Sequence, residues 1–351
     1  MTTSGAHSVT LTPEDRPETN DLLTVNDLTV DFTTGAGTVR AVDGASFSVP
    51  KGVSLGLVGE SGCGKSTTAY ALMRLLPRNG RIAAGEVRLN GADLVRASEK
   101  KLRDTRWRDI SMIFQNAMTA LNPVLRIGDQ LIDALRLHRE VSRRDALADA
   151  KQMFERVGLP PSRLMQYPHE FSGGMKQRAV IALALICGPS LVLADEPTTA
   201  LDVVAQRRIL ELLEELRAEL GNSLIMISHD ISAVAETCSQ VAVMYAGQIV
   251  ETGPTRATLL QSHHPYTHAL VSSFPALGVK ADRLPSIDGA PPDLSQPMVG
   301  CRFAPRCPFA QEVCRREAPP MVQVAPGRES RCHFATSLEL GSKPAPTRAD
   351  A

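Results

Sequence analysis

The stretch GESGCGKST, residues 59–67, constrains the fold of this 351-residue chain more than any other feature. It follows the apolar run VSLGLVG (53–59), which predicts a buried strand, and it opens a helical pattern over 65–76 that stops before Pro77. A strand, a loop with the spacing Gly-x-x-x-x-Gly-Lys-Ser and a helix together form a phosphate loop, in which backbone N–H groups and the helix N-terminus surround phosphate oxygens. A chance glycine-rich turn is the alternative, and the register of all three parts disfavours it.

Side chains of this loop supply specific contacts with a nucleotide. Lys65 is expected to reach the β- and γ-phosphates, and the Ser66 hydroxyl is expected to bind Mg²⁺. The other contacts are expected from the remaining loop residues, namely Gly59, Ser61, Gly62, Cys63, Gly64 and Thr67. The stretch therefore predicts a site for a nucleoside triphosphate and its magnesium ion.

Two carboxylates follow a second apolar run, LVLADE (191–196). At the end of a buried strand, Asp195 can be directed at the magnesium ion, and Glu196 can act as the general base for an attacking water. Two solvated carboxylates at a strand end are the alternative, which would be preferred if the pair stood alone. The phosphate loop upstream makes the hydrolytic interpretation the better one.

The rest of the pattern predicts an α/β fold with parallel pairing at the centre of its sheet. Apolar runs over 22–50 predict antiparallel strands and a further strand pattern lies near 85–90, whereas 116–188 has a helical texture. Further strands are expected at ISMIFQ (110–115), LVLADE (191–196) and SLIMISHD (223–230). A helix is expected over 203–220, ending at Gly221, and a hairpin is expected near Ala246-Gly247.

Composition divides the chain into three parts. A leader over 1–22, rich in Thr, Ser, Pro and acidic residues, is expected to be disordered. A nucleotide-binding domain is expected over 23–262, with a helical subdomain at about 116–188. From 263 to 345 proline becomes dense and periodicity fades, so we expect a small, irregular C-terminal extension there.

Charge and hydropathy argue against several classes of function. Lys+Arg and Asp+Glu both number 38, so a net charge of zero gives no global basic field for nucleic acid. No run of about 18 apolar residues predicts a transmembrane helix, and the polar N-terminus is not a secretory signal. We therefore expect a cytosolic chain, in which cysteines are more often thiols or metal ligands than disulfides.

The segment FSGGMKQR (171–178) predicts another anion site at a helix start. Ser172 is a good N-cap, and Gly173 and Gly174 allow close backbone approach; an ordinary capped helix is the alternative. With this segment the chain resembles the ATP-binding subunits of ABC transporters, whose signature motif is usually written LSGGQ. Phe171 and Met175 depart from that motif, while its Ser-Gly-Gly centre is intact.

Further positions match the motifs of this family in order, over about residues 23–260. They are Gln115 for the Q-loop, Ala200-Leu201-Asp202 for the D-loop, His229 for the switch histidine and, as a weaker match, Phe32 for an aromatic residue that stacks on adenine. The resemblance implies an ATPase in which Glu196, His229, Lys65 and Gln115 are catalytic. It also implies that Gln115 joins Ser66 and Asp195 around Mg²⁺, and that the nucleotide contacts include Gly173 and Asp202.

The resemblance also implies pairing of two subunits. In such proteins two nucleotide-binding domains pair head to tail, so Ser172 and Gly174 would contact the nucleotide of a second ATPase subunit. The helical subdomain would face the membrane permeases, and Gln115 would link the γ-phosphate to that interface. Closure on ATP and opening after hydrolysis would drive the transporter between states.

Three stretches narrow the resemblance to the oligopeptide/dipeptide branch, which includes nickel importers: ALNPVLRIGDQL (120–131), HPYTHAL (264–270) and GCRFAPRCPFAQEVC (300–314). We expect a peptide-importer ATPase at the cytoplasmic face of the cell membrane. Its partners would be a similar or identical ATPase subunit, two permeases and an external peptide-binding protein. A nickel or other small-solute importer of this branch is one alternative. A soluble ABC ATPase acting on nucleic acid or ribosomes is another, disfavoured by the single phosphate loop and neutral charge.

The extension contains four of the seven cysteines: Cys301, Cys307, Cys314 and Cys332. Thiolates suit zinc or iron–sulfur clusters. Zinc sites usually contain close cysteine pairs, which are absent here, whereas clusters tolerate varied spacing and a Cys-Pro step such as Cys307-Pro308. Because several members of the resembling branch carry a 4Fe–4S cluster at such a tail, we expect one here; zinc, free thiols and a lost site are the alternatives.

The other cysteines and the neighbouring histidines receive structural interpretations. Cys63 lies in a variable position of the phosphate loop, and Cys187 and Cys238 lie on apolar helical patterns. His263 and His264 could suggest a metal site, but His264-Pro265-Tyr266 is better interpreted as a packed turn.

Overall fold

The structure is a computed structural model that describes residues 21–35, 37–115, 120–199, 201–273 and 287–340. Most of the predicted leader therefore lies outside the described residues. The same is true of Ala200 in the D-loop match and of residues 116–119, where the helical subdomain was predicted to begin.

Four antiparallel strands form the smaller sheet, which confirms the prediction for 22–50 and 85–90. They are β1 (Asp21–Thr34), β2 (Gly37–Pro50), β4 (Gly80–Leu89) and β5 (Ala92–Asp93), in the order β2-β1-β4-β5. The apolar residues of β1, among them Leu23, Val25 and Val30, are fully buried and share one core with Ala69 and Leu72. This sheet therefore packs against the helix that follows the phosphate loop.

The larger sheet has eight strands in the order β11-β12-β10-β9-β3-β8-β7-β6. Its parallel centre consists of β3 (Ser54–Val58), β6 (Ile110–Ile113), β7 (Leu191–Asp195), β8 (Ser223–Ser228) and β9 (Gln240–Tyr245). Every residue of β3, β6, β7 and β8 is buried, as expected of a parallel sheet covered on both faces. The predicted turn at Ala246-Gly247 joins β9 to β10 (Gln248–Pro254).

The helix after the phosphate loop, α1 (Lys65–Leu72), is shorter than the predicted 65–76. Arg74 adopts a left-handed φ of 48°, and the N–H of Leu75 donates to the carbonyl of Tyr70 at 2.8 Å. This closure ends a helix before Pro77 is reached. By contrast, α7 (Val203–Leu220) ends at Gly221 with a φ of 67°, as predicted.

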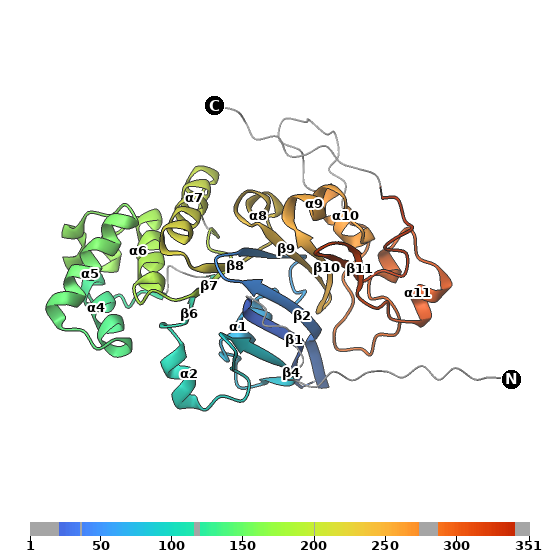
Figure 1. Ribbon diagram of the computed structural model, residues 1–351, viewed down its shortest axis with the longest axis horizontal. Coiled ribbons are helices and arrows are strands. Elements are labelled where there is room, and N and C mark those ends of the chain that lie inside the picture. Colours follow the sequence, from blue (N-terminus) through green and yellow to red (C-terminus); the bar gives the residue numbers. More distant parts are fainter. Residues whose placement is uncertain (1–20, 36, 116–119, 200, 274–286, 341–351) are drawn as a thin grey trace.

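Three helices gather at one end of the molecule, shown in green in Figure 1. They are α4 (Ile127–His138), α5 (Arg143–Arg156) and α6 (Gly173–Leu185), and the 3₁₀ turns Pro161–Met165 and Pro168–Glu170 lie between α5 and α6. Buried faces of all three pack into one core, which agrees with the helical texture predicted for this segment. The short helix α2 (Glu99–Thr105) precedes β6.

Helices α8 (Ile231–Thr237), α9 (Thr255–Leu260) and α10 (Pro265–Ser272) follow β8. Residues 287–340 form the opposite end of the molecule (Figure 1), with a 3₁₀ turn at Ala304–Arg306, α11 (Glu312–Arg316), β11 (Val322–Ala325) and β12 (Arg328–Ser330). Strand β12 pairs antiparallel with β10 through Glu251↔Ser330 and Thr252↔Glu329. The extension therefore continues the main sheet, which its fading periodicity did not predict.

The segment His264-Pro265-Tyr266 begins α10 rather than forming the predicted turn. The ring Nδ1 of His264 accepts a hydrogen bond from the N–H of Tyr266 at 3.0 Å, and Pro265 occupies the first helical position. Both features favour a helix start. His264 is nonetheless packed, as expected, with 1% of its surface exposed.

Candidate active site

The phosphate loop connects β3 to α1, and its glycines are required by close packing. A Cβ atom on Gly59 would lie 2.1 Å from the carbonyl oxygen of Met244. A Cβ atom on Gly64, which has a φ of 107°, would lie 2.5 Å from the carbonyl oxygen of Ala41. Neither position can accept a side chain without moving the neighbouring backbone. The loop is thereby held between β2 and β9, with the start of α1 at its end.

Lys65 is buried within this loop, with 6% of its surface exposed. Its ammonium group donates to the carbonyl oxygens of Gly59 at 2.8 Å and Glu60 at 2.9 Å. Cys63 beside it is also buried, and burial raises the pKa of its thiol even though Lys65 is close. Cys63 therefore remains a neutral packing residue, and Lys65 is the charge that the loop offers to phosphate.

Ser66 and Asp195 meet across the sheet. The Ser66 hydroxyl donates to Oδ1 of Asp195 at 2.9 Å, and Asp195 is fully buried, so that burial raises its pKa. Its second oxygen, Oδ2, has no hydrogen-bond partner among the described residues. A buried carboxylate oxygen without a partner beside a hydroxyl is a donor set that suits Mg²⁺, so these residues fit the predicted ion.

Glu196 follows Asp195 in a strained backbone conformation with a φ of 46°. Its Oε2 accepts hydrogen bonds from Gln115 Nε2 at 2.8 Å and Thr199 Oγ1 at 3.0 Å. Its Oε1 lies 3.0 Å from Nδ1 of His229. Burial alone would raise the pKa of Glu196, but the hydrogen bonds from His229, Thr199 and Gln115 outweigh it and lower that pKa. The carboxylate is therefore held ionised and oriented.

Three strand ends assemble this group. Gln115 follows β6, Glu196 follows β7 and His229 follows β8, and the carboxyl ends of neighbouring parallel strands meet at one edge of a sheet. Thr199 is an additional contact that sequence reasoning missed, although it stands three residues after Glu196 in EPTTALD. The side chain of Gln115 contacts Glu196 here, and its role as a magnesium ligand stays a prediction.

The predicted signature segment lies on a different element. Ser172 caps α6 by accepting a hydrogen bond from the N–H of Met175 at 3.4 Å, and a Cβ atom on Gly174 would meet open space. Among the described residues, no hydrogen bond or ion pair joins 171–176 to 59–67. In Figure 1, α6 lies at the green end while α1 lies near the centre. The signature is therefore presented away from the phosphate loop of its own chain.

The structure also locates Asp202 and Phe32, two residues predicted to contact the nucleotide. Asp202 caps α7, accepting a hydrogen bond from the N–H of Ala205 at 2.9 Å. Phe32 is half-buried on β1 and pairs with Gly80, where an added Cβ atom would lie 2.7 Å from the Phe32 ring. That ring covers the neighbouring strand, and its predicted stacking on adenine stays a prediction, as does the nucleotide contact of Asp202.

The four cysteines of the extension line one small cavity. Its other walls are mostly apolar, and the lining comprises His264, Pro265, Cys301, Phe303, Ala304, Cys307, Phe309, Cys314, Cys332, His333, Phe334 and Leu338. The cysteines are free thiols. The pKa of Cys307 is raised to about 11, mainly by burial and to a smaller extent by the nearby Cys301, Cys332 and Cys314. The fold thus gathers the predicted thiol set in one place, which we call the thiol cavity.

The thiols of this cavity can be compared with the ligands that zinc and iron–sulfur clusters need. Within the described part of the chain, no three His, Cys, Asp or Glu side chains are placed to hold a single metal ion. One zinc ion needs all its thiolates about 2.3 Å from a common centre. Four cysteine thiols that line one cavity match an iron–sulfur cluster in the type and number of donors.

Among the helices in the described part of the chain, none combines the length and the hydropathy that a membrane span requires.

Two family models match the chain: "ABC transporter" over residues 42–199 and "Oligopeptide/dipeptide transporter, C-terminal region" over residues 250–314. The latter match includes three of the four cysteines of the thiol cavity.

Curated relatives extend the similarity to nearly the whole chain. The oligopeptide transport ATP-binding protein OppD of Salmonella typhimurium is 47% identical over 315 residues, covering 89% of this chain and 93% of that protein. The dipeptide transport ATP-binding protein DppD of Bacillus subtilis is 49% identical over 301 residues, covering 85% and 90%.

A solved structure supports the fold independently. The ATP-binding cassette MJ0796, described as a dimer bound to ADP and Pi, superposes with a TM-score of 0.60 at 24% identity, covering 67% of this chain and 99% of that chain. With a complete phosphate loop, a buried Asp195 and an oriented Glu196, the site is that of an ATPase. This chain belongs to the ATP-binding subunits of the oligopeptide/dipeptide ABC transporters.

Proposed function

We propose that this subunit couples ATP hydrolysis to the uptake of di- and oligopeptides, acting at the cytoplasmic face of the cell membrane. The observation that carries the proposal is the presence of two parts in one fold. The hydrolytic centre lies at β3, β7 and β8, and the C-terminal region typical of peptide transporters begins within β10 of the same sheet. The names of the relatives, which specify oligopeptide and dipeptide transport, support the substrate class.

The residues of the site divide the work of hydrolysis. The backbone N–H groups at the start of α1 and the ammonium of Lys65 bind the phosphates. Ser66 and Asp195 would hold Mg²⁺, which neutralises phosphate charge when bound. The Glu196 carboxylate accepts the proton of the attacking water. Gln115 and His229 act on this step by keeping the carboxylate ionised and directed, as their hydrogen bonds to it indicate.

A second ATPase subunit completes the site in this proposal. Ser172 and Gly174 do not reach the phosphate loop of their own chain, and Gly174 faces open space. The helix start at α6 is therefore available to the nucleotide of a partner subunit, either a similar chain or a second copy. Two permease subunits in contact with the segment 116–188 and an external peptide-binding protein would complete the transporter.

We also propose that Cys301, Cys307, Cys314 and Cys332 hold a 4Fe–4S cluster in the thiol cavity. The support is the cavity that the four thiols line together, and their type and number, which match the four cysteine ligands of such a cluster. When bound, the cluster would cross-link the segments that carry these cysteines. Hydrogen bonds such as that from Cys301 N–H to the Cys314 carbonyl, at 2.7 Å, already hold these segments near one another.

Uptake by whole cells tests the substrate. The chain and its partner subunits are expressed in a strain that lacks its own peptide importers, and uptake of a radiolabelled tripeptide and of ⁶³Ni²⁺ is measured. We expect tripeptide uptake that disappears in a Lys65→Ala strain. Nickel uptake without tripeptide uptake would assign the chain to the alternative within this branch.

Anaerobic purification tests the cluster. An absorbance band near 400 nm, roughly where thiolate-bound clusters absorb, with about four irons and four sulfides per chain, is expected. A Cys307→Ser variant should lose iron, whereas Cys187→Ser, which changes a buried cysteine far from the cavity, should keep it. One zinc per chain and no iron would contradict the proposal.

A further inference from the structure

Glu60 of the phosphate loop is held at all three of its polar groups. Its N–H donates to the hydroxyl of Tyr266 at 2.8 Å, and its carbonyl accepts from the Lys65 ammonium. Its carboxylate forms a bidentate ion pair with Arg306, at 2.7 Å and 2.9 Å. Two of these three partners, Tyr266 on α10 and Arg306, lie more than 200 residues away in the extension.

Arg306 is built into the structure as a rigid connector. Only 5% of its side chain is exposed. The guanidinium donates to the carbonyls of Asp288 at 2.9 Å and Ile287 at 3.2 Å, and to the hydroxyl of Tyr245 at 3.3 Å. It also lies 5.8 Å from the centre of the Tyr245 ring. A planar, forked donor set used in this way is specific to arginine, because lysine cannot form the same bidentate pair.

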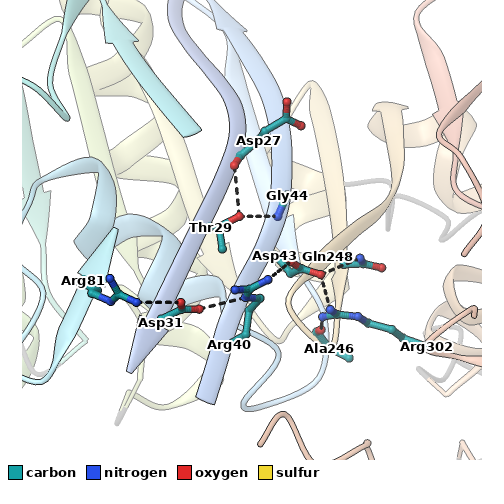
Figure 2. Close-up of polar contacts among 10 residues, drawn as sticks. All are labelled: Asp27, Thr29, Asp31, Arg40, Asp43, Gly44, Arg81, Ala246, Gln248 and Arg302. Atoms are coloured by element: carbon teal, nitrogen blue, oxygen red, sulfur yellow. Dashed lines mark hydrogen bonds and ion pairs between the residues drawn. The ribbon is translucent and has the colours of Figure 1, made fainter. Parts of the chain in front are cut away.

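The loop that carries Arg306, residues 301–307, connects the thiol cavity to the nucleotide-binding fold. Cys301 and Cys307 at its two ends line the cavity. Its second residue, Arg302, pairs with Asp43 on β2 and donates to the carbonyl of Ala246, as Figure 2 shows. The same loop is thus attached to the smaller sheet through Arg302 and to the phosphate loop through Arg306.

Asp43 extends the first of these attachments into a polar network. It also accepts hydrogen bonds from Gln248 at 3.2 Å and from Arg40 at 3.5 Å, and Arg40 in turn pairs with Asp31 at 3.0 Å (Figure 2). A displacement of residues 301–307, which we call the cysteine loop, therefore disturbs several contacts of β1 and β2. The cysteine loop cannot move independently of these two strands.

We propose that Arg306 is a positioning residue for the phosphate loop, and that it couples ATP binding to the ordering of the cysteine loop 301–307. The two carbonyls that hold the Lys65 ammonium belong to Gly59 and Glu60. Fixing Glu60 by its carboxylate therefore fixes the acceptors of Lys65. Because coupling between two sites is reciprocal, a nucleotide that orders the phosphate loop also orders 301–307.

Nucleotide affinity tests the positioning role. The full chain is titrated with a fluorescent ATP analogue as the parent, Arg306→Lys, Arg306→Gln and Arg316→Gln. Arg316 pairs with Glu312 on the exposed face of α11, so its variant removes the same charge from the same extension without touching the loop. We expect about fivefold weaker binding for Arg306→Gln, an intermediate loss for Arg306→Lys and parent affinity for Arg316→Gln. Parent affinity for Arg306→Gln would refute the proposal.

Turnover by the assembled transporter separates positioning from loss of fold. A partly unfolded Arg306→Gln subunit would lower kcat in proportion to the inactive fraction and leave KM for ATP unchanged. A misplaced phosphate loop raises KM for ATP instead. We expect a raised KM, and a lowered kcat with parent KM would count against the positioning role.

Hydrogen exchange tests the coupling itself, on chains of equal metal content. Binding of ADP with Mg²⁺ to the parent should slow amide exchange over 301–307, while α5 (143–156) serves as the internal reference. In Arg306→Gln at saturating nucleotide this protection should disappear. Equal exchange over 301–307 with and without nucleotide in the parent would show that the two sites are independent.

Discussion

Replacing Glu196 by glutamine isolates the chemical step of hydrolysis. The Glu196 carboxylate accepts hydrogen bonds from Gln115 and Thr199 and contacts His229. A glutamine keeps the volume and one acceptor oxygen, and the Thr199 hydroxyl and the His229 ring can each exchange donor for acceptor. The variant should therefore preserve the local geometry while removing the proton acceptor.

The expected loss is that of a general base. Such a group contributes about 10²–10⁴-fold to a rate, so turnover should fall by that factor, which corresponds to about 2.7–5.4 kcal/mol in the activation barrier. Nucleotide affinity should stay within about threefold of the parent, because the substitution leaves Lys65 and Asp195, the proposed partners of phosphate and magnesium, unchanged.

The assay measures phosphate release by the assembled transporter in proteoliposomes and, separately, binding of a fluorescent ATP analogue. Glu211→Gln provides the matched control, since Glu211 forms an exposed ion pair with Arg207 on α7. Turnover of Glu196→Gln near the parent rate would refute the assignment of the base. A parallel loss of nucleotide affinity would show instead that the substitution had disrupted the loop.

Two further predictions follow from buried groups. Lys65→Ala should weaken nucleotide binding by about 10–100-fold, because a charge-assisted contact with phosphate is lost; titration with the fluorescent analogue measures it, and binding within twofold of the parent would contradict it. Burial raises the pKa of Glu251 to about 7, above its unfolded value of about 4.3. The folded chain then binds more protons, so stability should fall as pH rises between these values. Unfolding midpoints at pH 5 and pH 8 should differ less for Glu251→Gln than for the parent, and an equal difference would show that Glu251 does not set this slope.

Local sequence signals predicted the nucleotide-binding core, because its strands and helices begin or end at residues typical of turns and caps. The glycines of the phosphate loop, Gly221 at the end of α7 and Ala246-Gly247 between β9 and β10 act within a few residues, where sequence patterns are informative. The early end of α1 was missed because Arg74 adopts a left-handed conformation, which is usually found at glycine. An arginine at this position does not predict the end of a helix.

Contacts between distant segments could not be predicted in the same way. Strands β11 and β12 are only four and three residues long, too short for an alternating pattern to predict them. The ion pair between Glu60 and Arg306 joins residues 246 positions apart, and such a contact produces no periodic pattern in the sequence. The cysteines were identified as a set by their number and their density, whereas their common cavity required the fold.

The pairing of β12 with β10 has a consequence for the solubility of shortened chains. Strand β10 is an interior strand of the sheet only because β12 covers it, and without residues 287–340 its unpaired N–H and C=O groups would form an open edge beside β9. Open edges bind other strands and promote aggregation. Removing the extension would therefore leave a nucleotide-binding core that associates with itself.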